Sequence, residues 1–286
     1  MAPTTPFGPD GLWLKREDEH ELGAFKWRGA AAVLEERRPD VVVTASTGNH
    51  GAATAWAARR AGVRAVVFVP RGASTAKTRL IDEQGAELHY AGADMDEAKA
   101  AARAHAGEHG GFFFEDGAEP AQFRGYEAIG DELLDELPEP AAVVVPVGNG
   151  ALAIGVFRAL ARRAPSALRV AVAAAEAPAM WESWHAGAPV DSERSGTFAD
   201  GLAVRVAIPL AVTELNALAQ RFELVSEAEL EGAVRGYAAA GIRVEGAAAA
   251  PLALALREDL PRPAVLIVTG RNIDDALYDR ILTSGT

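Results

Sequence analysis

The stretch AVVVPVGNGAL, residues 142–152, joins a run of apolar residues to the start of an amphipathic segment. Its first four residues are all apolar, which is typical of a strand buried on both faces of a parallel sheet. Gly148 and Gly150 then allow a tight turn, and residues 152–163 have the apolar spacing of a helix. Because free N–H groups at a helix start bind anions, the stretch predicts a strand, a phosphate-binding loop and a helix in succession.

The same succession of strand and helix repeats along the chain. The other apolar runs that predict strands are residues 41–43, 65–69, 169–173 and 264–268. The other segments that predict helices are residues 50–61, 95–105 and 227–239. Residues 186–197 are rich in Gly, Pro and Ser and predict a long loop. Strands that alternate with helices indicate an α/β fold with mostly parallel sheets, and 286 residues suffice for two compact lobes.

The composition excludes several classes of protein. The formal net charge is −12, so the chain lacks the basic excess with which proteins bind nucleic acid or anionic membranes. It has no cysteine, which excludes disulfides, thiolate zinc sites and cysteine-bound iron–sulfur clusters. No apolar stretch approaches the ~20 residues of a membrane span, and the N-terminus has no signal-peptide pattern. We therefore expect a cytoplasmic protein whose partners include neither nucleic acid nor membrane.

The glycine loop by itself leaves three interpretations open. A phosphate cradle is the first. The spacing Gly148-x-Gly150-x-x-Ala153 also fits a dinucleotide-binding fingerprint, with Glu176 near the place where an acid would bind a ribose. A nucleotide-dependent oxidoreductase is therefore equally compatible with this loop. A tight turn from strand to helix without any ligand is also common.

Lys26 stands between two aromatic residues, Phe25 and Trp27, just after the glycine turn at Gly23. Aromatic neighbours remove water from an amine and favour its neutral, nucleophilic form, as a Schiff-base lysine requires. A lysine whose stem packs on aromatic rings while its amine stays in water explains the same pattern. From this segment alone, the second interpretation is the better supported.

The predicted strand at residues 41–43 is followed by a polar loop with the sequence STGNHG, residues 46–51. Its hydroxyls, its amide and the N–H groups of a helix start suit a carboxylate ligand. Ser, Thr and Asn are also the preferred residues for capping a helix, so an ordinary cap is the alternative. The loop contains more polar groups than one cap needs, which favours a binding site.

Taken together, these segments resemble the fold-type-II family of pyridoxal-phosphate (PLP) enzymes, the tryptophan-synthase-β-like enzymes. The resemblance is greatest to the branch of serine/threonine dehydratases and serine racemases. The matching segments are LKRED (residues 14–18), GAFKWRGA (23–30), STGNHG (46–51), PVGNG (146–150), GTFADGLAV (196–204), VEG (244–246) and TGRN (269–272). Each is weak alone. They occur in the family's order over nearly the whole chain, and this ordered set argues against the dinucleotide interpretation.

The resemblance implies a role for the individual residues. Lys26 forms the Schiff base with PLP and then acts as the general base. The residues implied to bind the cofactor are Phe25 and Lys26, Asn49 at the 3′-oxygen, Gly148, Asn149, Gly150, Ala151 and Leu152 at the phosphate, Glu245 near the pyridine edge, and Thr269 at the pyridine nitrogen. The residues implied to bind the substrate are Ser46, Thr47, Gly48, Asn49, His50 and Tyr126. A hydroxyl at Thr269, unlike a carboxylate, does not stabilise a protonated pyridine, which favours elimination over transamination.

Three residues depart from the family's pattern or leave a choice open. Tyr126 stands where the family has a small residue after a glycine, which leaves the identity of the substrate open. Asn149 replaces a glycine of the phosphate loop, either as a further donor or because it tolerates a left-handed turn. Thr47 occupies the position of the hydroxyl that racemases place opposite the lysine. It is therefore a second candidate catalytic residue, and helix capping is the alternative that we favour.

Two pairs of side chains are candidate metal ligands. Glu176 and Glu182 match the spacing of a divalent-cation site found in some family members, although two carboxylates on a surface helix are the more common explanation. His105 and His109 lie four residues apart on a predicted helix. No third ligand is apparent, and Gly107 and Gly110 predict a fraying helix end, so we interpret both as surface histidines.

We therefore expect two three-layer αβα lobes with mostly parallel sheets and the cofactor between them. Residues 1–40 and 122–286 form the large PLP-binding domain, and residues 41–121 form the small domain. The expected activity is elimination of water from a small hydroxy amino acid such as serine or threonine, which gives a 2-keto acid and ammonia. The alternatives are amino-acid racemisation, β- or γ-replacement, and a protein that binds its ligand on this fold without turnover. The family likeness also implies a homodimer.

Overall fold

Each apolar run that predicts a buried strand forms one in the computed structural model, which describes residues 1–8 and 10–284. The chain divides into two compact units with one sheet each. Unit 1 consists of Met1–Ala24 and Tyr126–Thr286, and unit 2 of Phe25–Gly125.

The sheet of unit 1 has six strands in the order β1–β2–β10–β7–β8–β9. They are β1 (Thr4–Phe7), β2 (Leu12–Arg16), β7 (Ala142–Pro146), β8 (Leu168–Ala174), β9 (Arg221–Val225) and β10 (Ala264–Val268). β1 pairs antiparallel with β2, and all other neighbours run parallel. In the middle of the sheet, Leu266 of β10 pairs with Leu14 of β2 and Val144 of β7. The parallel strands therefore end at one edge, which is where ligands bind in sheets of this kind.

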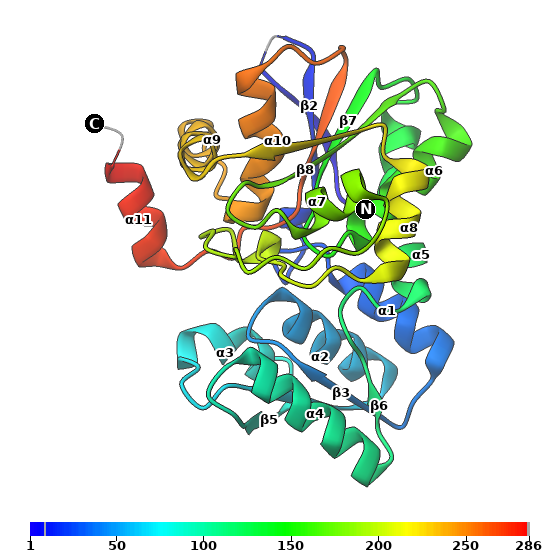
Figure 1. The fold of residues 1–286 in the computed structure, drawn as a ribbon, viewed down its shortest axis with the longest axis vertical. Helices are drawn as coiled ribbons and strands as arrows, with labels where there is room; N and C mark the ends of the chain where they lie inside the picture. Colours follow the sequence, from blue (N-terminus) through cyan, green and yellow to red (C-terminus); the bar gives the residue numbers. More distant parts are fainter. Residues whose placement is uncertain (9, 285–286) are drawn as a thin grey trace. The chain divides into compact units, whose positions relative to one another are not determined.

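Helices cover both faces of this sheet (Figure 1). On one face, α10 (Gly246–Arg257) packs on β7 to β10 and is followed outward by α9 (Glu227–Ala239), which α11 (Asp275–Thr283) contacts in turn. On the other, α6 (Ala151–Arg163) packs on β7 and β8 and contacts α8 (Pro209–Leu218). Short α7 (Ala179–Ala186) packs against α8 and β9. The unit is thus a three-layer αβα arrangement.

Unit 2 has a four-stranded parallel sheet in the order β5–β4–β3–β6. Its strands are β3 (Val41–Ala45), β4 (Arg64–Val69), β5 (Glu87–Tyr90) and β6 (Phe112–Phe113). Its helices are α1 (Trp27–Arg37), α2 (Asn49–Ala61), α3 (Thr75–Asp82) and α4 (Met95–His109). Val66 and Phe68 of β4 pack with alanines of α4, whereas Val67 and Val69 pack with α2 and with Ile81 of α3. Because both faces are covered, β4 is apolar without alternation.

The helix α5 (Pro120–Glu136) contains the division between the units, at Gly125 and Tyr126. Lys26 and α1, which precede residue 41, belong to unit 2. The domain boundaries predicted after residues 40 and 121 stay a prediction. Two three-layer units with mostly parallel sheets agree with the predicted α/β class.

One predicted helix end is wrong. α4 continues through Gly107 to His109, and Gly110, with a φ of 74°, forms its left-handed C-cap. The N–H of Gly110 is bonded to Ala106, so the helix ends in an ordered cap and does not fray at residue 107. Residues 187–199 form neither helix nor strand, as the composition of residues 186–197 predicts. Every helix in the described part of the chain is too short or too polar to span a membrane.

Candidate active site

The loop after β7 turns sharply into α6. Gly150 is the N-cap of α6 and has a φ of 92°, a left-handed conformation that favours glycine. The side-chain Oδ1 of Asn149 accepts a hydrogen bond of 3.1 Å from the N–H of Ala151. Among the described residues, Asn149 is not one of those with a positive φ. The interpretation that it adopts the left-handed turn is therefore wrong, and its side chain instead closes the turn.

The two glycines of this loop are required for different reasons. A Cβ at Gly148 would lie 2.2 Å from the carbonyl oxygen of Gly201, so the loop packs directly on the backbone of another segment. A Cβ at Gly150 would lie 2.9 Å from Leu215 Cδ1, in addition to the strain of its positive φ. The loop has no lysine or arginine, so its donors to an anion are neutral N–H groups at a helix start.

Thr269 and Glu245 form a buried hydrogen-bonded pair at the carboxyl end of β10. The hydroxyl of Thr269 donates to Glu245 Oε1 over 3.0 Å. A Cβ at Gly270 would lie 2.8 Å from the Glu245 carboxylate, so the glycine lets the carboxylate approach the chain. Gly270 also forms an isolated bridge with Ala24. This bridge links the end of β10 to Ala24, and Lys26 follows Ala24 two residues later in the sequence.

Lys26 is the N-cap residue of α1, and its amine has an ionic partner. Its Nζ lies 2.6 Å from Asp116 Oδ2 and 5.2 Å from the centre of the Phe25 ring. The side chains of Lys26 and Asp116 are 18% and 26% exposed. The contact of the amine with a carboxylate 90 residues away in sequence was not part of either interpretation of this segment.

Asp116 is a residue that the sequence interpretation missed. Burial raises the pKa of Asp116, but the charge of Lys26, with hydrogen bonds from Lys26 and Gln122, lowers it well below its ordinary value. Gln122 Nε2 donates to Asp116 Oδ1 over 2.6 Å, and Gln122 Oε1 accepts from the N–H of Gly117 over 2.7 Å. Asp116 is therefore an ionised, fixed carboxylate. Asp116 lies in the sequence FEDG, which matches no motif, so only the fold shows that it contacts Lys26.

The polar loop at residues 46–51 turns into α2 within unit 2. Ser46 Oγ accepts a hydrogen bond of 3.1 Å from the N–H of Gly48, which is the N-cap of α2. A Cβ at Gly51 would lie 2.8 Å from Ser46 O, so the glycine lets the helix begin against the loop. Because Gly48 is the N-cap residue, Thr47 lies one position before it, and a role of this loop as an ordinary helix cap stays a prediction. Its backbone donors suit a carboxylate.

His50, in the first turn of α2, is buried. Its Nε2 lies 3.0 Å from Thr44 Oγ1, and because that hydroxyl donates to Phe114 O over 2.7 Å, we assign the proton of the ring to Nε2. The other ring nitrogen, Nδ1, lies 3.6 Å from Asp116 Oδ1. Burial lowers the pKa of His50, and the carboxylate of Asp116 opposes that effect. The imidazole is therefore neutral at neutral pH.

The remaining predicted residues do not form a recognisable centre of their own. Tyr126 is 1% exposed, and its place in a substrate pocket stays a prediction. Glu182 Oε1 accepts a hydrogen bond from Arg194 over 3.1 Å. In the part of the chain that the structure describes, no three His, Cys, Asp or Glu residues are placed to hold a metal ion. A cation at Glu176 and Glu182 stays a prediction that these residues do not support.

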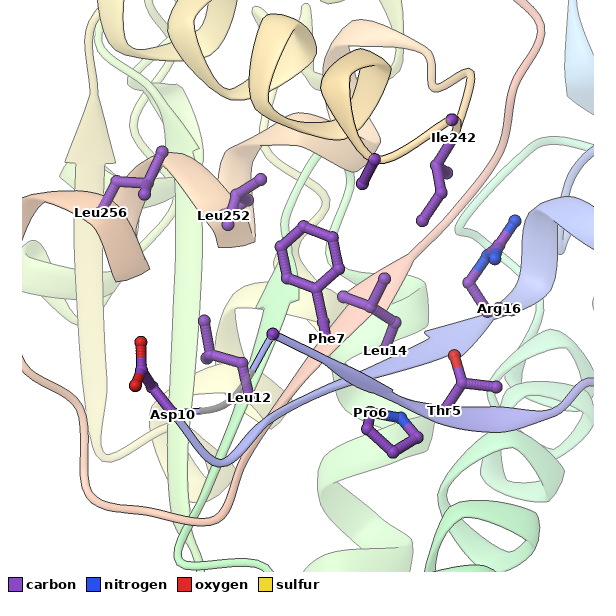
Figure 2. A pocket seen from close by; sticks show the side chains of 13 residues that line it. Thr5, Pro6, Phe7, Asp10, Leu12, Leu14, Arg16, Ile242, Leu252 and Leu256 are labelled. Carbon is purple, nitrogen blue, oxygen red and sulfur yellow. The ribbon is translucent and has the colours of Figure 1, made fainter.

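A cavity of about 750 Å³ in unit 1 is lined by residues other than the predicted site residues (Figure 2). Figure 2 shows the Phe7 ring between Leu14 and Leu252, with Asp10 and Arg16 toward opposite ends. The guanidinium of Arg16 pairs with Asp18 over 2.7 Å, so its charge is already compensated. Because none of the predicted site residues lines it, we assign this cavity no part in the active site.

Comparison with known proteins identifies relatives along most of the chain. The model of the family described as pyridoxal-phosphate dependent enzyme matches residues 3–270. The L-threonine ammonia-lyase of Geobacter sulfurreducens is 33% identical over 271 residues, which cover 92% of this chain and 67% of that protein. The processed form of threonine deaminase isoform 2 from Solanum lycopersicum has a TM-score of 0.90 at 26% identity, covering 94% of this chain and 82% of its own. Maize serine racemase has a TM-score of 0.87 at 26% identity, covering 96% of this chain and 87% of its own.

Proposed function

Because the chain belongs to the family of pyridoxal-phosphate-dependent enzymes, we propose that it is an ammonia-lyase acting on a small hydroxy amino acid. The reaction removes water from a substrate such as serine or threonine and gives a 2-keto acid and ammonia. A relative named L-threonine ammonia-lyase and a structure named threonine deaminase support this proposal. The fold-type-II resemblance and the cofactor predicted from the sequence are confirmed by the family match and the structural likenesses.

The residues of each unit fit the cofactor. In unit 1, the turn at Gly148 and Gly150 leads into the N–H groups at the start of α6, which suit a phosphate. The buried pair Thr269 and Glu245 supplies a hydroxyl and a carboxylate for a pyridine ring. In unit 2, the amine of Lys26 is partly exposed and can bond to an aldehyde carbon. We infer that these groups hold the phosphate, the ring and the aldehyde carbon of PLP, respectively.

When bound, the cofactor withdraws electrons from Cα of the substrate. The chain supplies the remaining functions. The N–H groups of the loop at residues 46–51 bind the substrate carboxylate and orient the Cα–H bond. The free amine of Lys26 would accept the Cα proton at Nζ.

The observation that carries elimination is the hydroxyl of Thr269 at the end of β10. This hydroxyl is neutral and bonded to Glu245, so it does not maintain a proton on a pyridine nitrogen as an acidic partner does. A pyridine ring held by this neutral hydroxyl would supply weaker electron withdrawal, which would favour loss of the β-hydroxyl over transamination. The proposal thus depends on a neutral group at this position.

Racemisation is the second candidate activity, and one observation favours it. Thr47 is not the N-cap residue of α2, which is Gly48, although capping is the simplest role for a threonine at a helix start. Its hydroxyl therefore remains a candidate proton carrier. Replacement at the β- or γ-carbon and ligand binding without turnover are also compatible with this fold, and they rank below racemisation because no contact of the described residues favours them.

We also infer that the protein is a cytoplasmic homodimer, in line with the family likeness. Light scattering during size-exclusion chromatography tests the dimer, since a mass near twice 29.9 kDa is expected. A mass near that of one chain would refute it.

The absorption spectrum and a substrate panel test the proposed function. The purified protein with PLP should absorb near ~410–420 nm, as a lysine-bound cofactor does. Lys26→Ala should remove this band, and its persistence would refute the assignment of Lys26. Release of keto acid from serine or threonine supports the lyase, and inversion without release supports the racemase. Spectral shifts without turnover across the panel would indicate a binding protein.

A further inference from the structure

None of the proposed reaction steps uses the ion pair between Lys26 and Asp116. Its distance of 2.6 Å is that of a charge-assisted hydrogen bond, and both side chains are mostly buried. It lies within unit 2, so the geometry of that unit alone determines it. An amine that acts as a base gains a positive charge, and a carboxylate at this distance stabilises that charge.

The carboxylate of Asp116 is fixed from the side opposite the lysine. Gln122, fully buried in the first turn of α5, donates to Oδ1, while Oδ2 faces Lys26. The amide of Gln122 is fixed in turn by the N–H of Gly117. His50, the other titratable group near Asp116, is neutral and presents Nδ1 without a proton, so it does not satisfy the charge. Lys26 is therefore the cationic partner of this carboxylate.

We propose that Asp116 is a positioning residue that holds the protonated amine of Lys26. The proposal rests on the proposed function, in which the Cα–H bond breaks and a new N–H bond forms at Lys26 Nζ. The electron pair of the broken bond stays on the substrate, and the proton stays on Lys26. Asp116 takes no proton, because it remains a carboxylate, and it accepts the hydrogen bond of the ammonium group that forms.

A purely structural role for Asp116 predicts a different behaviour. In that case, loss of the charge would weaken the fold of unit 2 without changing how reactive the amine of Lys26 is. If Asp116 holds the amine of Lys26, replacing Asp116 by a neutral residue removes this charge-assisted contact, and the amine reacts more readily with an electrophile. The reactivity of Lys26 therefore separates the two roles, and it can be measured without catalysis.

The chain is well suited to this measurement because it contains only four lysines, Lys15, Lys26, Lys77 and Lys99. The full-length protein, freed of cofactor, is labelled with trinitrobenzenesulfonate at neutral pH, and each lysine is followed by peptide mass spectrometry. We expect Asp116→Asn to increase the labelling rate of Lys26 on the order of tenfold, the effect of losing one charge-assisted hydrogen bond. Asp116→Glu, which keeps the charge, should restore slow labelling.

The neighbouring acid provides a matched control. Among the described residues, the ionic partners of Glu115 are Lys99 and Arg103, and Lys26 is not one of them. Glu115→Gln should therefore increase the labelling of Lys99 and leave that of Lys26 unchanged. In Asp116→Asn, Lys99 should react at its native rate. Asp116→Ser is the second neutral variant if Asp116→Asn does not fold.

A measurement on the holoenzyme completes the test. With serine carrying deuterium at Cα, Asp116→Asn should show a lower kcat, a nearly unchanged KM and a larger kinetic isotope effect, because proton transfer to Lys26 becomes slower. Labelling of Lys26 at the native rate in both neutral variants would overturn the proposal. That result is distinct from failure of the proposed function, which would appear as a missing absorption band or an inactive substrate panel.

Discussion

Gly148→Ala tests the packing that shapes the phosphate loop. A Cβ at this position would lie 2.2 Å from the carbonyl oxygen of Gly201, and real Cβ atoms essentially never come within 3.0 Å of such an atom. The two backbones must therefore separate by about 0.8 Å, the difference between these distances, and no side-chain rotation relieves the contact. Overpacking of this kind costs about 1–3 kcal/mol, and 1 kcal/mol lowers Tm by roughly 2–4 °C in a domain of this size. We expect Tm to decrease by roughly 2–12 °C.

The assay compares thermal unfolding and cofactor affinity in parallel. A displaced loop also misplaces its N–H donors, so the affinity for PLP, titrated by the visible absorption band, should decrease with Tm. Gly107→Ala is the matched control: no atom lies within 4 Å of its added Cβ, and alanine is the better helix former within α4. It should keep or slightly raise Tm. A Gly148→Ala protein with native Tm and native PLP affinity would refute the reasoning.

Two further substitutions test the buried polar groups. Burial lowers the pKa of His50 in the folded protein. The unfolded chain therefore binds a proton at His50 at a higher pH than the folded protein does. As a result, the free energy of unfolding should decrease as the pH falls below 6.5. His50→Gln should show a smaller decrease of Tm over that range, and an identical pH dependence in both proteins would contradict this account. Thr269→Val keeps the shape of the side chain and removes the donor to Glu245, which should cost about 1–3 kcal/mol in urea unfolding. Thr269→Ser should retain most of that free energy, and native stability of the valine variant would argue against the hydrogen bond.

The sequence predicts well those parts of the fold that are determined by residues close together in the chain. Residues 264–268 are apolar at every position because β10 is buried on both faces, and its predicted limits coincide with those observed. The turn at Gly150 was predictable for the same reason, since a positive φ at a helix start favours glycine. The role of Asn149 was not, because an asparagine serves a left-handed turn or a side-chain hydrogen bond equally well.

The site residues that sequence does not reveal are those brought together by the fold. Asp116 and Lys26 are 90 residues apart, and neither residue carries a pattern that names the other. The bond from Thr269 to Glu245 likewise joins two loops that are adjacent only at the sheet edge. The ordered set of family motifs located both loops, but the partner of each side chain required the structure.

The pairing of β2 with β10 also has a consequence for the order in which the protein is assembled during synthesis. Leu12 of β2 pairs with Ala264 of β10, so β2 cannot complete this pairing until about 250 further residues have been synthesised. At ribosomal rates, that interval is on the order of tens of seconds. Phe25–Gly125 is complete long before then and contains its whole sheet. Unit 2 can therefore fold on the ribosome while the six-stranded sheet is still incomplete. Thr269 is the last of the candidate site residues to be synthesised.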